Sequence, residues 1–569
     1  MRSCLFAVLW ASAAAAQPLI LEGELPEGGP DFVRVPFEVP AGTVEVEVRH
    51  PVQQPQNILD YGLDDPLRTV GWGGGNTEAI VVNAQAASRS YLPGPVTAGT
   101  WSVVIGKAKV LVKPARYRLE IELRTTTSLP AQPERAPYAH APALSKEARW
   151  YAGDLHVHSR ESGDADPTLD EIATFARGRG LDFVELSDHN VASPLTLMRD
   201  AQGRHPQLLF VPGVEFTTYA GHANGIGATE YVDHRFGLDG ATFEGAVAEF
   251  QRQGAVFSIN HPVLDLGTAC IGCAWKQPIP RDTLGAVEIG TGGWDKTGVL
   301  FTKQAIAYWD RLVGQGVKAA PIGGSDDHSA GARMGAFDSP IGNPTTLVFA
   351  KELSVPGLLE GLKAGRTMVK LQGPDDPLVD IVPPLAALDS TSDVATLVGS
   401  TVRAPSDSAE LAFAVKGGNG AVLKLIVDGE EHEAIAITSV DFTARRSFAI
   451  PAAGEARLRA EVWVDGNPRT VSGHVFLTKA TEPPKGCGCS APGGGLFLAV
   501  LALFGLRRPR GLMATISTRR ARDAAGVEAV RLREGRGENR FENSPLLPSL
   551  LTFSGWAAPR PPPTIAVTR

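Results

Sequence analysis

Two periodicities divide the chain. Between about residues 30 and 125, apolar and polar residues alternate with the period of two that is typical of half-buried strands. Val44, Val46 and Val48 alternate with charged residues in this way, and turn-forming glycines and prolines separate such segments. We predict an N-terminal all-β sandwich over residues 17–128, followed by a Pro- and Ala-rich linker over residues 129–149.

The middle of the chain alternates helical patterns with short apolar runs. Apolar residues recur at helical spacing over residues 169–176, with Asp166 as the expected cap and Gly180 as the expected stop. A second helical pattern begins at Phe243 and stops at Gly254. An apolar run of strand length follows each pattern, and this alternation predicts a (β/α) barrel.

The alternation of period two returns after the predicted barrel. Two apolar strands lead into Asp428-Gly429 and Asp465-Gly466, which are dipeptides typical of hairpin turns. We predict an Ig-like β-sandwich over residues 379–478, and nothing in it indicates catalysis.

Histidines and carboxylates fall just after the predicted strands of the barrel. Residues i and i+2 of a strand point to the same side, so His156 with His158, and Asp326 with His328, each present a pair of ligands. Ser187-Asp188-His189 and Asn260-His261 follow two further strands. A barrel gathers such strand ends on one face, which predicts a metal site there.

The segment over residues 150–373 resembles the PHP (polymerase and histidinol phosphatase) metallohydrolases and, within them, the CehA/McbA-like branch. The resemblance rests on six short motifs in the order of the family: Gly153-Asp154-Leu155-His156-Val157-His158-Ser159, Ser187-Asp188-His189-Asn190, Pro212-Gly213-Val214-Glu215-Phe216, Gly221-His222-Ala223-Asn224, Asn260-His261-Pro262 and Gly323-Gly324-Ser325-Asp326-Asp327-His328.

The resemblance implies a distorted (β/α)7 TIM-like barrel that holds two or three divalent ions, Zn, Mn or Fe. The implied first ion takes four ligands: His156, His158, Glu215 and Asp326. Glu215 bridges to a second ion, which His222 and His261 complete. The implied third ion takes His189, His328 and Asp164, a position that is histidine in some relatives. Imidazole and carboxylate ligands together suit these metals.

The resemblance also implies roles around the ions. Glu215, His261 and Asp326 are the expected catalytic residues, acting through metal-bound water. The carboxylates Asp154, Asp188 and Asp327 are either second-shell groups that orient the histidines or ordinary turn aspartates. Arg366 is either a contact for substrate phosphate or part of a surface salt bridge.

Cysteines are sparse. We expect Cys270 and Cys273 to form a local disulfide that pins a loop at the rim of the site. A redox centre and a zinc knuckle are the alternatives, and a knuckle would need a second Cys or His pair nearby.

The composition bears on the partners of the protein, and the N-terminal segment bears on its location. The formal net charge of -8 and the pI near 5.9 provide no basic field, so we expect no nucleic-acid partner. Residues 1–16 fit a secretory signal peptide, with a buried N-terminal helix as the alternative. We therefore expect an exported protein that is either secreted or associated with the cell surface or outer membrane.

The C-terminal region over residues 483–510 joins a Cys-Gly-Cys motif, an apolar run and an arginine cluster. It is similar to the C-terminal sorting tails of myxobacterial-type surface proteins, which implies a transient membrane contact; a short apolar terminal helix is the alternative. Residues 511–569 are expected to be disordered or a spurious extension of the reading frame.

Three functions follow from this sequence. The first is a metal-dependent phosphoesterase that acts on a small-molecule or polymer ester through a metal-bound hydroxide. The second is hydrolysis of a carboxylic ester or carbamate at the same site. The third is a non-catalytic surface binding protein with a PHP scaffold. The sequence leaves the substrate and the oligomeric state open.

Overall fold

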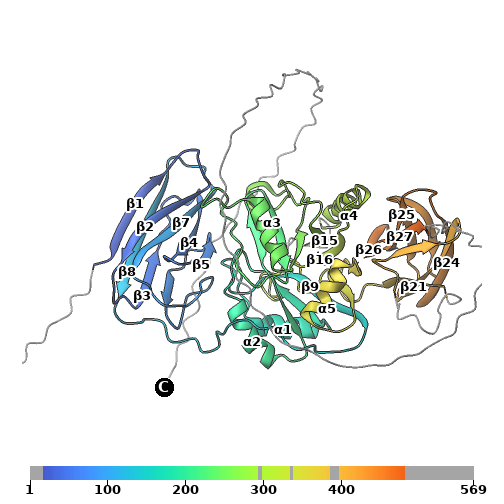
Figure 1. The fold of residues 1–569 in the computed structure, drawn as a ribbon, viewed down its shortest axis with the longest axis horizontal. Helices are drawn as coiled ribbons and strands as arrows, with labels where there is room; N and C mark the ends of the chain where they lie inside the picture. The colour runs from blue at the N-terminus through green and yellow to red at the C-terminus, as the bar shows by residue number, and fades with distance from the viewer. Residues whose placement is uncertain (1–16, 292–297, 334–337, 385–395, 481–569) are drawn as a thin grey trace, which may run out of the picture. The chain divides into compact units, whose positions relative to one another are not determined.

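The computed structural model describes residues 17–291, 298–333, 338–384 and 396–480 (Figure 1). The predicted signal peptide, the sorting tail and residues 511–569 lie outside the described residues. All described residues belong to one compact unit. No helix within the described ranges is both long and apolar enough to span a membrane.

The N-terminal region consists of two antiparallel four-stranded sheets. The first sheet has the order β1 (Leu19–Leu25), β8 (Ala115–Arg124), β3 (Glu45–Arg49) and β6 (Ile80–Asn83). The second has the order β2 (Phe32–Val39), β7 (Gly99–Lys109), β4 (Ile58–Asp64) and β5 (Thr69–Gly74). One apolar cluster, which includes Val46, Leu63 and Trp101, draws residues from both sheets. The alternating pattern thus forms strands that bury one face each.

The central region carries two groups of strands. In the first, parallel strands β9 (Arg149–Val157), β10 (Phe183–Leu186) and β11 (Leu209–Pro212) continue into antiparallel β17 (Thr345–Ala350) and β18 (Thr367–Lys370). The second has the order β12 (Glu215–Thr218), β13 (Gly221–Ile226), β14 (Val256–Ile259), β15 (Leu284–Thr291) and β16 (Ala320–Gly324).

Backbone hydrogen bonds join these two groups just beyond the strand ends. Asp326 N donates to His156 O at 2.8 Å and His158 N to Asp327 O at 3.1 Å, so the segment after β16 pairs with β9. Glu215 N donates to Ser187 O at 3.0 Å, which joins β12 to the end of β10. These bonds bring segments that carry predicted ligands together.

The fold is mixed α/β, as predicted, and rich in strands, but the predicted distorted (β/α)7 TIM-like barrel is not confirmed. β13 runs antiparallel to both β12 and β14, and β17 runs antiparallel to β9. Only Tyr219 and Ala220 separate β12 from β13, and a connection this short allows an antiparallel pair but no helical crossover.

Along the chain, the helices of the described region alternate with strands of the central region. They are α1 (Leu169–Gly178), α2 (Leu195–Arg204), α3 (Phe243–Arg252), α4 (Gly298–Gly314) and α5 (Val355–Lys363), with a short 3-10 turn, η1 (Gly267–Ala269). The predicted stops at Gly180 and Gly254 are confirmed, because both glycines adopt positive φ just past a helix. The predicted cap is wrong: Thr168 caps α1, and its capping box with Glu171 satisfies the first backbone amides.

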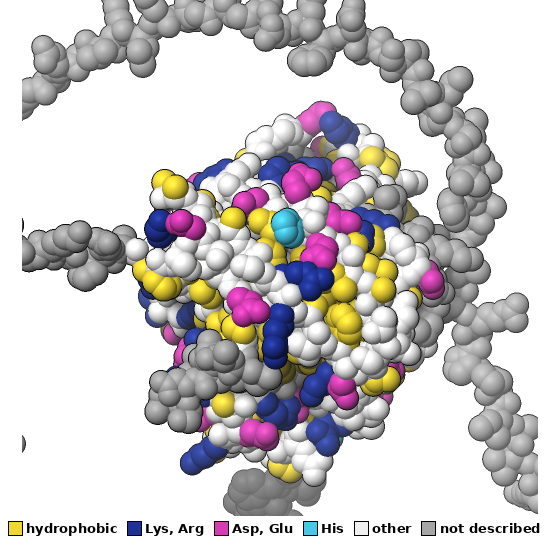
Figure 2. All heavy atoms as spheres, turned by 90° about the vertical axis from the view of Figure 1, so that its right-hand side faces the viewer, with side chains coloured by type: hydrophobic (Ala, Val, Ile, Leu, Met, Phe, Trp, Pro, Cys, Tyr) yellow, Lys and Arg dark blue, Asp and Glu magenta, His cyan; other side chains and the backbone are white. Residues whose placement is uncertain are grey.

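The C-terminal region has two sheets, and the larger one continues a central sheet. β18 pairs with β26 (Asn467–Ser472), and the sheet extends through β25 (Glu455–Val464), β22 (Val422–Val427) and β23 (Glu430–Ala436), with β27 (Val475–Lys479) and β20 (Thr401–Ala404) alongside. A second sheet contains β19 (Leu378–Val382), β21 (Ser408–Lys416) and β24 (Asp441–Ala449). Acidic and basic side chains are interspersed on the face shown in Figure 2.

Candidate metal centre

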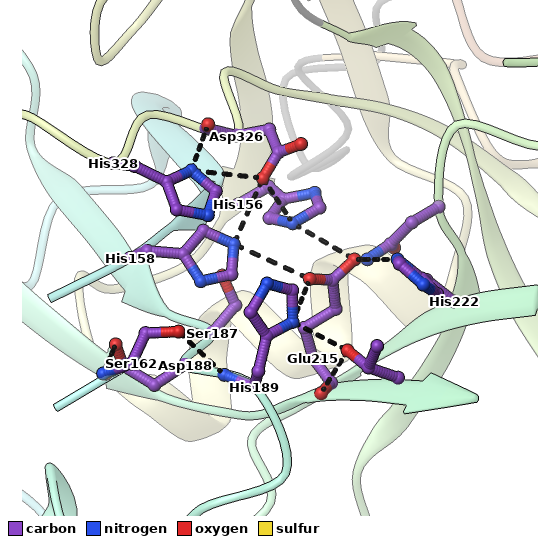
Figure 3. Close-up of polar contacts among 12 residues, drawn as sticks. His156, His158, Ser162, Ser187, Asp188, His189, Glu215, His222, Asp326 and His328 are labelled. Carbon is purple, nitrogen blue, oxygen red and sulfur yellow. Dashed lines mark hydrogen bonds and ion pairs between the residues drawn. The ribbon is translucent and has the colours of Figure 1, made fainter. Parts of the chain in front are cut away.

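The predicted ligands converge at the ends of the central strands (Figure 3). His156 lies in β9 and His158 directly follows it, while Glu215 begins β12 and His222 lies in β13. The other predicted ligands lie in loops that follow strands: Asp164, His189, His261, Asp326 and His328. Segments distant in the sequence thus present imidazoles and carboxylates to one shared space.

The first ligand group forms as predicted. The ligand atoms of its members lie within 4.8 Å of one another: His156, His158, Glu215 and Asp326. Asp326 Oδ1 is 3.2 Å from His156 Nε2 and 3.0 Å from His158 Nε2. All except the half-buried Asp326 are buried, so the group offers a nearly enclosed cation site.

The second ligand group shares Glu215. Its Oε1 lies 3.3 Å from His222 Nδ1 and 3.2 Å from His261 Nε2. The other nitrogen of each ring faces a backbone carbonyl: His222 Nε2 is 3.1 Å from Ile271 O, and His261 Nδ1 is 2.9 Å from Cys273 O. Because a carbonyl only accepts, these contacts place the ring protons there and leave the ligand nitrogens with free lone pairs.

The third ligand group overlaps the first. His158, His189 and His328 have ligand atoms within 4.8 Å of one another, so His158 belongs to two groups, where the sequence predicted one. Asp164 Oδ2 lies 3.3 Å from His189 Nε2 and 3.5 Å from His328 Nε2, and the Asp164 side chain is 56% exposed. The more exposed third group is therefore the one nearest to solvent.

The predicted second-shell aspartates bind backbone rather than imidazole. Asp154 accepts from the amides of His156, Ser325 and Gly342. Asp188 and Asp327 likewise accept backbone amide protons, from the loops after β9 and β16. They orient the ligand-bearing segments rather than the imidazole rings, because each carboxylate satisfies backbone amides of a neighbouring loop.

Sequence reasoning missed three polar residues that contact the ligands. Glu288 Oε2 accepts from His156 Nδ1 at 2.9 Å, Asn260 Nδ2 donates to Glu215 Oε1 at 3.0 Å, and Thr217 Oγ1 lies 2.6 Å from His189 Nδ1. A carboxylate inside the apolar strand β15 was a readable signal for Glu288, since a buried carboxylate needs a partner. Asn260 and Thr217 offered no such signal.

The backbone at two ligands is strained. His261 adopts φ of 26° and Asp326 φ of 57°, in the region that residues with a Cβ rarely occupy. Such conformations cost about 1–3 kcal/mol each and concentrate at functional sites. The surrounding fold thus holds these two residues in place despite the conformational free energy that their backbone costs.

The electrostatics of the site suit cation binding. Burial opposes ionisation of Glu215, but the charges on His156, His189 and His222 outweigh it and hold the pKa of Glu215 well below its ordinary value. Burial, together with the charges on His328 and His189, lowers the pKa of His158 to about 3. An ionised carboxylate and a neutral imidazole, as at Glu215 and His158, are the forms that bind metals. Burial opposes the charge on His156, but Asp326 and Glu215 raise its pKa well above the ordinary value, so a bound ion would displace that proton.

Several buried ligand atoms have an imidazole or carboxylate nearby but form no well-aligned hydrogen bond within the described residues. They are His156 Nε2, His158 Nε2 and Glu215 Oε2. Leaving such atoms unpaired costs about 1–3 kcal/mol each, more for charged groups, and a divalent ion would satisfy all three at once. The residues present therefore fit the implied ions.

Two further predictions concern residues outside the ligand groups. The structure pairs Cys270 with Cys273 in a disulfide, and the loop that it closes borders the second ligand group. Arg366 pairs with Glu360 at 3.6 Å and precedes β18, level with the amino end of β9. The ligands lie at the other end of β9, which favours the salt-bridge alternative for Arg366 over a substrate contact.

No family model and no curated protein matches the sequence. Among similar solved structures is a two-domain protein from Bacteroides vulgatus, described as containing a predicted PHP-like metal-dependent phosphoesterase. It is 18% identical, with 61% of this chain and all 100% of that chain covered, at a TM-score of 0.32. A protein from Bifidobacterium adolescentis to which a metal-dependent phosphoesterase function is attributed is 13% identical, with 33% and 91% covered, at a TM-score of 0.23. Similarities at this level carry no argument about activity, which rests on the site itself.

Proposed function

We propose that the chain is an exported, PHP-type metal-dependent hydrolase that cleaves phosphate esters. The observation that carries the proposal is the cluster of buried ligand atoms on His156, His158 and Glu215, which face one space without a well-aligned hydrogen bond. A scaffold without a bound cation would gain stability by replacing these groups with apolar ones. Their presence supports a bound cation rather than a scaffold without one.

The charge of the site favours an anionic ester. Three carboxylates, on Asp164, Glu215 and Asp326, face two or three divalent ions, and the histidines add no negative charge. With three ions bound, the site is net positive even when the Glu288 carboxylate beside His156 is counted, and it then attracts a phosphate ester more strongly than a neutral carboxylic ester or carbamate. When bound, divalent ions in such a centre polarise ester oxygens and lower the pKa of water.

The residues of the chain position the reaction. Glu215 is shared between two ligand groups, and Asn260 fixes its Oε1 by donating from Nδ2. Glu288 holds the proton on His156 Nδ1, so that His156 Nε2 keeps its lone pair toward Asp326. The exposed Asp164 marks the side from which solvent and an ester reach the centre.

The test measures metal content and hydrolysis on the full chain. Mass spectrometry should find two or three transition ions per chain, and a screen should cover phosphomonoesters, phosphodiesters, carboxylic esters and carbamates. His156→Ala and Glu215→Gln should lower both metal content and hydrolysis. His205→Ala is the matched control, because His205 bonds Asp170 on α1, away from the ligand groups.

Full metal content in both ligand variants would refute the assignment of the site. Hydrolysis of carboxylic esters or carbamates but not of phosphates would favour the second function. Metal binding without any hydrolysis would favour the non-catalytic one.

The location is proposed from sequence alone. Residues 1–16 support export, and residues 483–510 support sorting to the cell surface or outer membrane. N-terminal sequencing of the exported protein should find residue 17 first. Deletion of residues 483–510 should release the protein into the medium.

A further inference from the structure

The disulfide loop contacts the second ligand group directly. Ile271 O and Cys273 O accept from His222 and His261 and so set the tautomers of both rings. Gly272 lies against the turn of the β12–β13 hairpin, where an added Cβ would come 2.2 Å from Thr218 O. The loop therefore belongs to the wall of the site rather than to its distant surroundings.

The sulfur of Cys273 lies within reach of an ion at that site. Its Sγ and one ring nitrogen each of His222 and His261 all lie within 4.8 Å of one another, and Cys273 is 4% exposed. Ligands around one tetrahedral zinc are about 3.5 Å apart, given bond lengths of 2.0–2.3 Å. A shift of about 1 Å, within the freedom of a side chain released from a disulfide, would bring the sulfur into the coordination shell.

We propose that Cys273 is a latent metal ligand that the Cys270–Cys273 disulfide withholds. A sulfur bonded to another sulfur carries no negative charge, whereas a thiolate is a strong ligand for zinc and similar ions. In the oxidised chain, His222, His261 and Glu215 leave one position of a four-coordinate ion open. In the reduced chain, Cys273 fills that position.

The reduction step balances with an external dithiol. A thiolate of the dithiol attacks Sγ of Cys270, the more exposed of the two residues, and Cys273 leaves as a thiolate. The second thiol of the dithiol then displaces Cys270, which takes up a proton. Two electrons pass to the protein, and the dithiol becomes a disulfide.

The consequence for activity rests on the proposed function. Catalytic ions keep a position open, whereas structural ions are closed by four protein ligands. Reduction would therefore close the second ion position and suppress hydrolysis, and oxidation after export would open it. The chain would remain inactive in a reducing compartment.

The test uses cobalt(II), because a bound thiolate adds a ligand-to-metal charge-transfer band that histidine and carboxylate do not produce. The full chain carries Cys4→Ser, Cys487→Ser and Cys489→Ser, so that Cys270 and Cys273 are its only thiols. Treatment of this parent with a dithiol should produce the band. Oxidation should remove it while cobalt remains bound.

Two single substitutions form a matched pair, since each removes the disulfide and leaves one free thiol. Cys270→Ser should show the band without any reductant, and Cys273→Ser should lack it under all conditions. Circular dichroism and cobalt stoichiometry establish that both variants are folded and loaded. If either variant does not fold, the reduced and oxidised parent alone decide the question.

Hydrolysis by the oxidised parent should fall at least about tenfold on reduction, and it should not fall in Cys273→Ser. No band in the reduced parent, or equal bands in both variants, would overturn the inference. A band that depends on Cys273 in a chain that hydrolyses no ester would instead refute the proposed function and leave the latent ligand standing.

Discussion

The two β regions that flank the metal centre are built alike but join the central strands differently. The N-terminal region makes side-chain contacts with the loops that carry ligands. Asp60 of β4 accepts from the hydroxyl of Tyr219, in the turn between Glu215 and His222, at 2.7 Å. Arg89 donates to Ala165 O, beside Asp164. The C-terminal region instead extends a central sheet through β26, and its ion pairs reach α4.

The two β regions therefore have different roles. Contacts of the N-terminal region act on segments whose position decides the geometry of the ions. Contacts of the C-terminal region act on a sheet edge and a helix that carry none of the ligands. Damage on the C-terminal side should therefore lower stability alone, whereas damage on the N-terminal side should also lower metal content.

The largest expected effect is on the C-terminal side. Asp310 of α4 accepts from Arg457 at 3.1 Å and from Arg459 at 2.5 Å, and the Arg459 side chain is 6% exposed. Asp310→Ala leaves Arg457 without this partner and Arg459 with Glu461 alone, and it should lower the free energy of unfolding by about 3 kcal/mol. Metal content of the folded protein should not change. Asp407→Ala, at an exposed ion pair with Lys479, is the control and should cost less than about 1 kcal/mol.

The next effect depends on pH. Burial lowers the pKa of His474 from 6.5 to about 4, despite the nearby Asp310. As pH falls, the imidazole of His474 is protonated in the unfolded chain before it is protonated in the folded chain. The stability that neutral His474 contributes is therefore complete above pH 6.5 and is lost as pH falls toward 4. The loss is about 1.4 kcal/mol of unfolding free energy per pH unit. His474→Phe should remove this share of the acid sensitivity in urea unfolding.

The exposed His432→Phe is the control for that experiment and should keep the slope of the parent chain. An unchanged slope in His474→Phe would contradict the assignment. A change in metal content in His474→Phe would contradict the division of roles.

A smaller effect is expected at Gly163, on the N-terminal side. A Cβ there would lie 2.3 Å from Gly73 O, so the loop that carries Asp164 must move away from β5. Gly163→Ala should lower the free energy of unfolding by about 1–3 kcal/mol and reduce metal content by the ion of the third group. Gly178→Ala is the control, because nothing lies within 4 Å of its added Cβ. Full metal content in Gly163→Ala would contradict the role given to the N-terminal region.

The smallest effect compares two hydroxyl deletions. Tyr219→Phe removes the hydrogen bond to Asp60 and should cost about 1 kcal/mol of unfolding free energy, together with part of the metal affinity. Tyr308→Phe, on α4, is its match, because the buried Tyr308 hydroxyl has no hydrogen-bond partner among the described residues. That variant should be neutral or slightly stabilising. Equal effects of the two substitutions on metal affinity would break the comparison.

Particular residues show how far sequence reasoning reached. The ligand pair His156 and His158 was readable because the period of a strand places i and i+2 on one side. The cap of α1 was misread as Asp166, although Thr168 and Glu171 have the spacing of a capping box, a local signal that was present in the sequence. The distorted (β/α)7 barrel is not confirmed, because alternating helices and strands do not reveal which neighbouring strands are antiparallel.

The sequence by itself determined the types of ligand, their order and the strands that deliver them, because strand period and side-chain chemistry are properties of a few neighbouring residues. Only the tertiary structure decided that His158 serves two groups, that Glu288 holds His156 across a separation of 132 residues, and that the disulfide loop sets the tautomers of His222 and His261. Such pairings depend on distances between segments remote in the chain, which packing of the whole core fixes and no local pattern encodes.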